Sequence, residues 1–263
     1  MRIQTVSKSS VARLSLLSFA AILLATSSAA QQTTLPAPSP ASDSSQPPKY
    51  SLQDQRTNNS DIRRQEQTGT SNDRLFYTLP NFLTVETKNV PPLTSGQKFK
   101  VVTRGSFDPI EIPWYAALAG VGQAQNSEPG YGQGAAGYGK RFAASFADGT
   151  IENYLTGAVL PSVLHQDPRY FQEGQGGFCR RTGYAVSRIF VTRTDSGLRQ
   201  FNYSEIFGSA LAAGISTYSY HPQSDRNLAN AASVWGTQVG YDILTIVVKE
   251  FWPDIRQNLR KRN

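Results

Sequence analysis

The chain is poor in the side chains that most often build disulfides, metal centres and nucleophilic sites. Its 263 residues include one cysteine and two histidines. The single cysteine, Cys179, excludes an intrachain disulfide and any zinc site that needs several cysteines. With only His165 and His221 as imidazoles, a histidine-based metal centre is disfavoured, and we expect no metal and no other cofactor.

Strong charge and long apolar runs are also missing. The formal net charge is +7, and three basic residues with no acidic counterpart precede Gln31, so removing that segment leaves +4. This mild charge suits contact with an anionic membrane surface or envelope polymer and is too weak to indicate nucleic-acid binding. Beyond residue 30 no run of about 18 residues is apolar and uncharged, so we expect no membrane-spanning helix.

Residues 1–30 have the three parts of a bacterial secretory signal peptide. Basic residues precede the apolar run LSLLSFAAILLA (14–25), and the small residues Ser28 and Ala30 stand at the −3 and −1 positions of a cleavage site. The apolar run is shorter than the roughly 20 residues that span a bilayer. We therefore predict cleavage before Gln31, with the mature protein in the periplasm or outer envelope.

The next two segments contain few residues that would build a core. Residues 31–73 are rich in proline, serine, glutamine and asparagine, a composition that predicts a disordered linker, acting either as a tether or as an idle tail. Residues 74–107 predict an extended lead-in segment, interrupted by a Pro-Pro pair and by a turn at Ser95-Gly96.

Residues 108–255 predict one mainly α-helical domain, a compact bundle of about four to five helices. Residues 256–263 form a basic tail that either contacts anionic lipid or frays in solvent. Periodic apolar residues predict helices over 108–126, 135–160, 204–218 and 228–251, the last ending before Pro253.

The segment 180–203 allows two interpretations. It is rich in β-branched residues and has no clean helical face. Residues 180–194 form a helix in the first interpretation, whereas in the second they pair as a hairpin across the Asp195-Ser196-Gly197 turn. We favour the helix because the neighbouring segments are helical.

Small residues mark one predicted helix contact. Gly208, Ala212 and Ser216 recur at four-residue spacing, which lets two helix backbones approach closely. We expect this face to pack against another helix, with Gly236 and Gly240 of the 228–251 helix as the expected partner.

Residues 137–255 contain five distinctive sequence segments: YGKRFAASFADGTIENYL, LHQDPRYF, RTGYAVSRIFVTRTDSG, FNYSEIFGSALAAGIS and KEFWPDI. These segments resemble an uncharacterised family of exported bacterial envelope proteins. The resemblance implies export and a domain that folds as a unit, and it implies no activity.

The densest group of reactive side chains is His165, Asp167 and Arg169. As a catalytic group, His165 would be a general base, Asp167 its orienting carboxylate and Arg169 an anion clamp. In the alternative, which we favour, Asp167-Pro168 makes a turn and Arg169 pairs with a carboxylate.

Asp242 is predicted to lie on an apolar helix face with Trp235 and Val239. A carboxylate there needs a partner. It is either a titratable group in a pocket or a structural ion pair with Arg188 or Arg193, and we favour the ion pair.

Two functional hypotheses follow. The first is a non-enzymatic envelope protein that binds a membrane surface or another envelope component. The second is a phosphatase-like envelope hydrolase using His165 or His221, since Ser187-Arg188 and His221 loosely resemble elements of membrane phosphatases. Whether the protein is an enzyme stays open, and we lean against it. An enzyme would gather its reactive groups in one pocket, and a structural protein would hold them in separate ion pairs.

Overall fold

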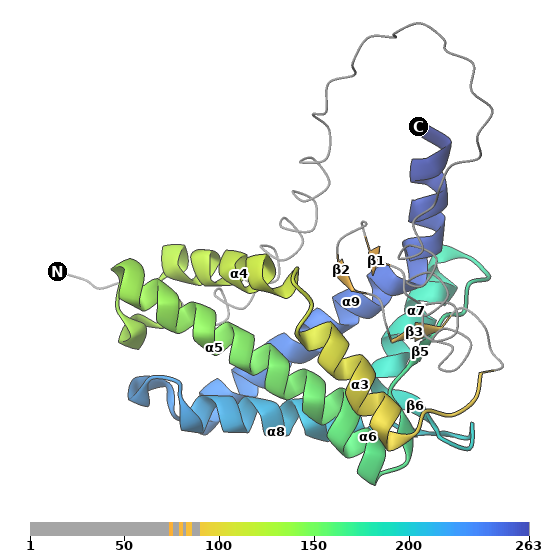
Figure 1. Ribbon diagram of the computed structural model, residues 1–263, viewed down its shortest axis with the longest axis horizontal. Helices are drawn as coiled ribbons and strands as arrows, with labels where there is room; N and C mark the ends of the chain where they lie inside the picture. The colour runs from red at the N-terminus through yellow and green to blue at the C-terminus, as the bar shows by residue number, and fades with distance from the viewer. Residues whose placement is uncertain (1–73, 76–78, 81–82, 86–89, 263) are drawn as a thin grey trace, which may run out of the picture.

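The computed structural model describes residues 74–75, 79–80, 83–85 and 90–262. The predicted signal peptide (1–30) and linker (31–73) lie outside the described residues. Within them the protein is mainly helical with a few short strands, as predicted (Figure 1).

The lead-in segment is only partly extended. Its first residues form three two-residue strands, β1 Arg74–Leu75, β2 Leu79–Pro80 and β3 Thr84–Val85. The prediction of extended chain is wrong over its second half, where α3 spans Ser95–Ser106. The reason is local: Thr94 and Gln97 form a capping box, with the Thr94 amide donating to Gln97 Oε1 at 2.8 Å.

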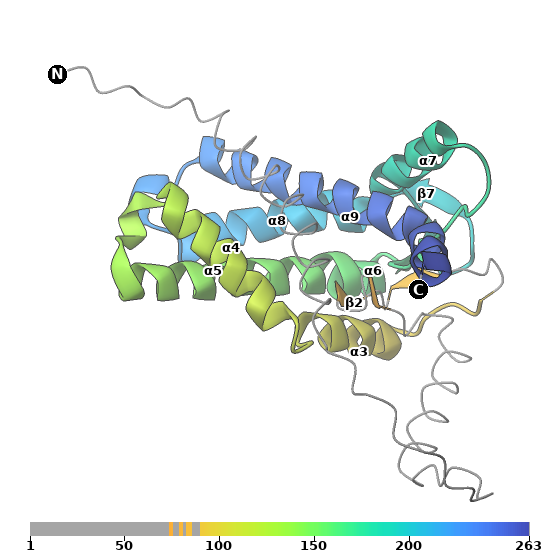
Figure 2. The ribbon, with the colours of Figure 1, turned by 90° about the horizontal axis from the view of Figure 1, so that it is seen from above.

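The helices of the bundle occupy the predicted regions. α5 runs into a π-helical turn, η2, and then into α6, and Figure 2 shows α8 lying between α9 and α5. Short 3-10 turns, η1 and η3, precede α5 and α9. The bounds are α4 Glu111–Gln125, η1 Pro129–Tyr131, α5 Gly134–Tyr154, η2 Leu155–Val159, α6 Leu160–Val163, α8 Tyr203–Ser219, η3 Gln223–Asp225 and α9 Leu228–Arg262.

Both interpretations of segment 180–203 apply, each to a different part. α7 spans Phe178–Phe190, and the chain then forms a hairpin of β6 Val191–Thr194 and β7 Arg199–Phe201. Gly197 in the turn has φ +86°, a conformation that favours glycine. β4 Gln166–Asp167 pairs with β6 to make a three-stranded sheet, and β5 Tyr170–Phe171 pairs with β3.

The prediction that the last helix ends before Pro253 is wrong. α9 continues through Pro253 to Arg262 and changes direction along its length in Figure 1. A proline removes one backbone hydrogen bond and bends a helix, but contacts on both sides preserve it here. Trp252 is buried, and Arg181 pairs with Glu250 before the proline and with Asp254 after it. The basic tail is therefore helical as far as Arg262.

The α8 face formed by Gly208, Ala212 and Ser216 is buried as predicted, but Gly208 packs against η2 and not against Gly236 of α9. A Cβ at Gly208 would lie 3.0 Å from Thr156 Cγ2, so this face meets η2. A Cβ at Gly236 has no neighbour within 4 Å, so Gly236 is not the partner. α8 does pack against α9 elsewhere, where the Trp235 indole donates to Ser209 Oγ at 3.0 Å.

The apolar stripe of α8 faces outward. The buried residues of α8 are small or polar, whereas every exposed residue of this helix except Ser219 is apolar or aromatic. The only charged side chain of α8, Glu205, lies inside the bundle. The exposed residues, with their exposed fractions, are Tyr203 45%, Phe207 58%, Leu211 49%, Ile215 37% and Tyr218 49%.

Candidate functional site

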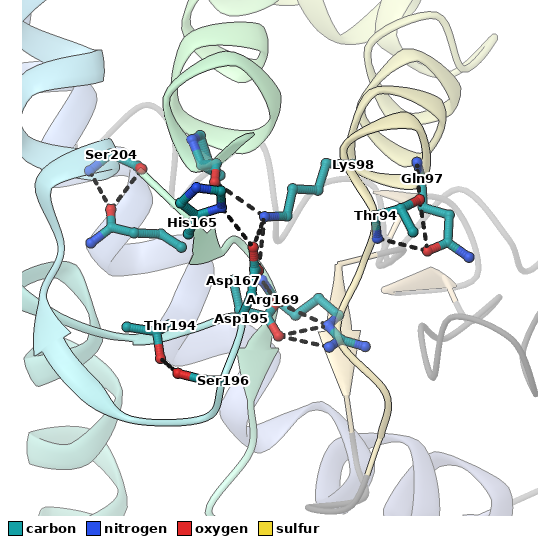
Figure 3. Close-up of polar contacts among 12 residues, drawn as sticks. Thr94, Gln97, Lys98, His165, Asp167, Arg169, Thr194, Asp195, Ser196 and Ser204 are labelled. Atoms are coloured by element: carbon teal, nitrogen blue, oxygen red, sulfur yellow. Dashed lines mark hydrogen bonds and ion pairs between the residues drawn. The ribbon is translucent and has the colours of Figure 1, made fainter. Parts of the chain in front are cut away.

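His165 stands apart from the groups that would make it catalytic. It follows α6 with φ +53° and its side chain is 84% exposed. Its nearest carboxylate is Asp195, with Nδ1 4.0 Å from Oδ2, and not Asp167. The predicted pairing of His165 with Asp167 as base and orienting carboxylate is therefore absent from the structure (Figure 3).

Asp167 and Arg169 form a buried ion pair with each other. Arg169 Nη2 lies 2.6 Å from Asp167 Oδ2, and Arg169 Nε and its backbone N–H both donate to Oδ1. Arg169 Nη2 also donates to Pro91 O at 2.8 Å. Because these contacts use both side chains to fix a turn, the structure agrees with the interpretation that Arg169 pairs with a carboxylate.

A second buried cation was not found from the sequence. Lys98 of α3 is 1% exposed, and its ammonium lies 2.8 Å from both carboxylate oxygens of Asp195. It also donates to Pro161 O at 3.1 Å. Figure 3 shows this pair joining α3 to the β6–β7 hairpin. The capping-box pattern at Thr94 was the sequence feature that would have placed Lys98 on a helix.

The two phrases LHQDPRYF and KEFWPDI meet in a buried polar network around Glu250. Glu250 accepts from Tyr170 Oη at 2.7 Å, from Arg181 Nε at 2.9 Å and from two backbone amides. The Arg181 guanidinium also lies over the Phe251 ring, 4.4 Å from its centre. This network joins α7 and β5 to α9, so Tyr170 of LHQDPRYF and Glu250 of KEFWPDI have a structural role.

Asp242 lies in a cluster of ionisable groups, but its predicted partners are wrong. The groups that act on it are Glu205 of α8 and Lys249 of α9, not Arg188 or Arg193. Burial and the Asp242 charge raise the pKa of Glu205 well above its usual value, and burial also raises the pKa of Asp242. Burial therefore favours the neutral form of Glu205, while the charge of Lys249 favours the ionised form of Asp242.

Glu152 of α5 completes the cluster. Burial and the charge of Asp242 raise the pKa of Glu152, so it too favours its neutral form. Within the described residues, no three histidine, cysteine or acidic side chains are arranged to hold a metal ion. The cluster is an internal polar contact between α5, α8 and α9.

His221 is held between two carboxylates at the far end of α8. Its Nδ1 lies 3.1 Å from Glu128 Oε1 and its Nε2 3.2 Å from Asp148 Oδ2, and the side chain is 4% exposed. Burial opposes the imidazolium, but the hydrogen bonds and charges of Asp148 and Glu128 outweigh it and raise the pKa to about 10. His221 is therefore a cation at neutral pH and is not available as a base.

Cys179 is an exposed free thiol near the start of α7. Among the described helices, none has the length and apolarity that crossing a membrane requires.

One small pocket contains cationic groups that lack an acidic partner. It has a volume of about 80 Å³ and lies where α7, the β4-β6-β7 sheet and the start of α8 meet. Arg188 and Arg193 both line it, and neither forms an ion pair with a carboxylate of the described residues. From the sequence, both arginines were expected as partners of Asp242, and Arg188 also as part of the phosphatase-like Ser187-Arg188 element, but not as the lining of one pocket.

The chain matches no protein-family model, no curated protein and no solved structure. The reactive side chains predicted from the sequence therefore have to be judged by their geometry. His165 is exposed, Asp167 and Arg169 neutralise each other, and Asp242 and His221 belong to separate clusters.

Proposed function

We propose that the protein is exported and acts at the cell envelope as a non-enzymatic protein that rests on a membrane surface through α8. Export is supported by the three-part pattern of residues 1–30 and by the resemblance to exported bacterial envelope proteins. The observation that carries the membrane contact is the outward-facing apolar stripe of α8, defined as Tyr203, Phe207, Leu211, Ile215 and Tyr218.

Such a stripe is unusual on a surface that faces water. Contiguous exposed apolar patches mark interaction sites, whereas single exposed apolar residues are ordinary. Aromatic contacts extend the stripe at one end, because the rings of Phe201 and Tyr203 lie 5.1 Å apart and Tyr203 stacks with Phe207 at 6.1 Å. The stripe is therefore a continuous surface and not a set of isolated side chains.

The chemistry of the stripe favours lipid as its occupant. Tyr203 and Tyr218 stand at its ends, about 22 Å apart at 1.5 Å per residue, and Leu211 and Ile215 lie between them. Tyrosine has an apolar ring and a polar tip, so it suits the boundary between acyl chains and headgroups. The outer face of α8 carries no charge that lipid would have to desolvate, and the mildly basic mature chain favours an anionic surface.

The scattering of the reactive groups supports a non-enzymatic role. His165 and His221, the two histidines of the hydrolase hypothesis, occupy separate environments, and His221 is bound by two carboxylates. A catalytic group needs its nucleophile, base and anion-stabilising donors within reach of one substrate atom. The arrangement of these side chains does not favour the hydrolase hypothesis.

Vesicle flotation tests the membrane contact. The full chain should float with vesicles that contain phosphatidylglycerol, and Leu211→Ser should weaken binding about tenfold, as expected when a half-exposed leucine no longer enters the interface. The matched control is Leu228→Ser, because Leu228 is 78% exposed but lies at the start of α9. If the wild type does not float and Leu211→Ser instead dissolves a dimer, the stripe binds a second copy and the proposal is wrong.

A further inference from the structure

We infer that the pocket lined by Arg188 and Arg193 binds a phosphate group, either as a soluble phosphate compound or as the headgroup of a phospholipid. This inference does not depend on the membrane contact of α8. It rests on the charge, the hydrogen-bonding capacity and the size of the pocket.

The two arginines line the same pocket and each lies over one of its aromatic rings. The charges of both lower the pKa of the Tyr184 hydroxyl, although burial raises it more. Arg188 lies over the Tyr184 ring at 4.7 Å from its centre, and Arg193 lies over the Phe171 ring at 4.2 Å. Stacking on aromatic rings fixes the plane of each guanidinium while leaving its N–H groups free to bind an anion.

Most of the hydrogen-bonding capacity of these arginines is unused. Arg188 donates from Nε and Nη2 to Ser187 Oγ, at 3.3 and 3.1 Å, and Nη1 has no acceptor in the described part of the chain. Arg193 donates no side-chain hydrogen bond within those same residues. No nitrogen of Arg188 or Arg193 is both buried and without a partner, so their unused donors reach solvent and are open to an anion that enters the pocket.

The pocket holds an excess of positive charge, because three arginines (Arg169, Arg188 and Arg193) line it against two carboxyl groups (Asp167 and Glu205). Asp167 stands directly opposite Arg193 in the β4–β6 register, but its carboxylate already accepts four hydrogen bonds from three N–H groups of Arg169. That pair is neutral as a whole. The other acidic residue of the pocket is Glu205, and burial and the charge of Asp242 raise its pKa well above the usual value, which favours its neutral form.

The excess charge matches a phosphate group better than a carboxylate. A phosphate monoester carries about −1.5 to −2 charges near pH 7 and has three strong acceptor oxygens, whereas a carboxylate is satisfied by one arginine. The pocket volume of about 80 Å³ is enough for a few waters or one small oxyanion and is well below that of a site for a drug-sized ligand.

Calorimetric titration of the full chain with inorganic phosphate, against sodium chloride of equal ionic strength, tests the inference. We expect saturable binding that Arg188→Gln and Arg193→Gln each weaken about tenfold to a hundredfold. Arg199→Gln is the control, because Arg199 is exposed directly opposite Arg193 on β7 and does not line the pocket. It should keep nearly normal affinity.

Vesicles distinguish the two sources of the phosphate group. A preference for phosphatidic acid over phosphatidylglycerol at equal surface charge, lost in Arg188→Gln, identifies a lipid headgroup. Binding of inorganic phosphate without that preference identifies a soluble ligand. Leu211→Ser should leave phosphate titration unchanged, so failure of the membrane proposal is separable from failure of this one.

Three results would overturn the inference. The first is a wild-type protein that binds neither inorganic phosphate nor phosphatidic acid more tightly than chloride or phosphatidylglycerol, a result that needs no variant to fold. The second is phosphate binding that stays unchanged in Arg188→Gln and Arg193→Gln when circular dichroism shows both to be folded. The third is selective binding of acetate over phosphate.

Discussion

Gly208 tests how closely α8 approaches the π-helical turn, and thereby which face of α8 is buried. A Cβ at this position would lie 3.0 Å from Thr156 Cγ2 and 3.3 Å from the carbonyl carbon of Leu155. The Thr156 side chain has some freedom to move, but the Leu155 backbone belongs to η2 and does not. Gly208→Ala should therefore force the two elements apart.

Gly214, on the same helix, supplies the reference. A Cβ there has no neighbour within 4 Å, so Gly214→Ala gains the helix propensity of alanine, about 0.5–1 kcal/mol. Gly208→Ala gains the same amount but adds an overpacking cost of about 1–3 kcal/mol. The difference between the two variants should therefore be about 1–3 kcal/mol, and Gly208→Leu should be worse than Gly208→Ala.

Urea denaturation followed by circular dichroism measures this difference, provided that the slope of the free energy of unfolding against urea is unchanged. Equal stabilisation by Gly208→Ala and Gly214→Ala would refute the close packing of α8 against η2. Equal stabilisation would also argue against burial of the Gly208 face, and therefore against an apolar stripe of α8 that faces solvent.

Three further results are expected. Folding raises the pKa of His221 from 6.5 to about 10, so its ion pairs should stabilise the folded state fully below about pH 6.5 and lose that stabilisation as the pH rises toward 10. His221→Asn should abolish this part of the pH dependence of the free energy of unfolding. Asp195→Asn should lower the free energy of unfolding by about 3 kcal/mol and Lys98→Met by about 1 kcal/mol. Lys98 is 1% exposed and Asp195 26%, so removing Asp195 leaves a buried charge unpaired, whereas removing Lys98 leaves a charge that water reaches. Equal losses of stability in thermal denaturation would contradict this. N-terminal sequencing of the exported protein should return Gln31, and Met1 would disprove the signal peptide.

The positions of the helices from residue 108 onward were largely predictable from the sequence, whereas α3 and the end of α9 were not, and helix orientation was only partly predictable. The period of the apolar residues located α8 because Phe207, Leu211 and Ile215 recur every four residues. The same period normally indicates the buried face, and here those residues face outward while Gly208 packs inside. Periodicity identifies a face and does not say what covers it.

The partners of buried charged side chains in the candidate site could not be predicted from the sequence either. Arg141 of α5 is 2% exposed, and its guanidinium donates to Gly132 O at 2.7 Å and to Glu128 O at 2.8 Å, two acceptors that no local pattern assigns to it. The prediction of the partner of Asp242 was wrong because Glu205 lies on another helix, α8, and Lys249 lies on a later turn of α9. Such pairings depend on tertiary packing, which no local pattern encodes.

The membrane contact of α8 is tested most directly by a fluorescent probe placed on the stripe. Leu211→Cys, in a Cys179→Ser background, carries an environment-sensitive dye at the centre of the stripe, and Leu228→Cys carries the same dye at an exposed position outside it. On adding phosphatidylglycerol vesicles, the dye at Leu211 should shift to the blue and become protected from aqueous quenchers, while the dye at Leu228 should not change. Unchanged emission at both positions, or equal shifts at both, would contradict binding through α8.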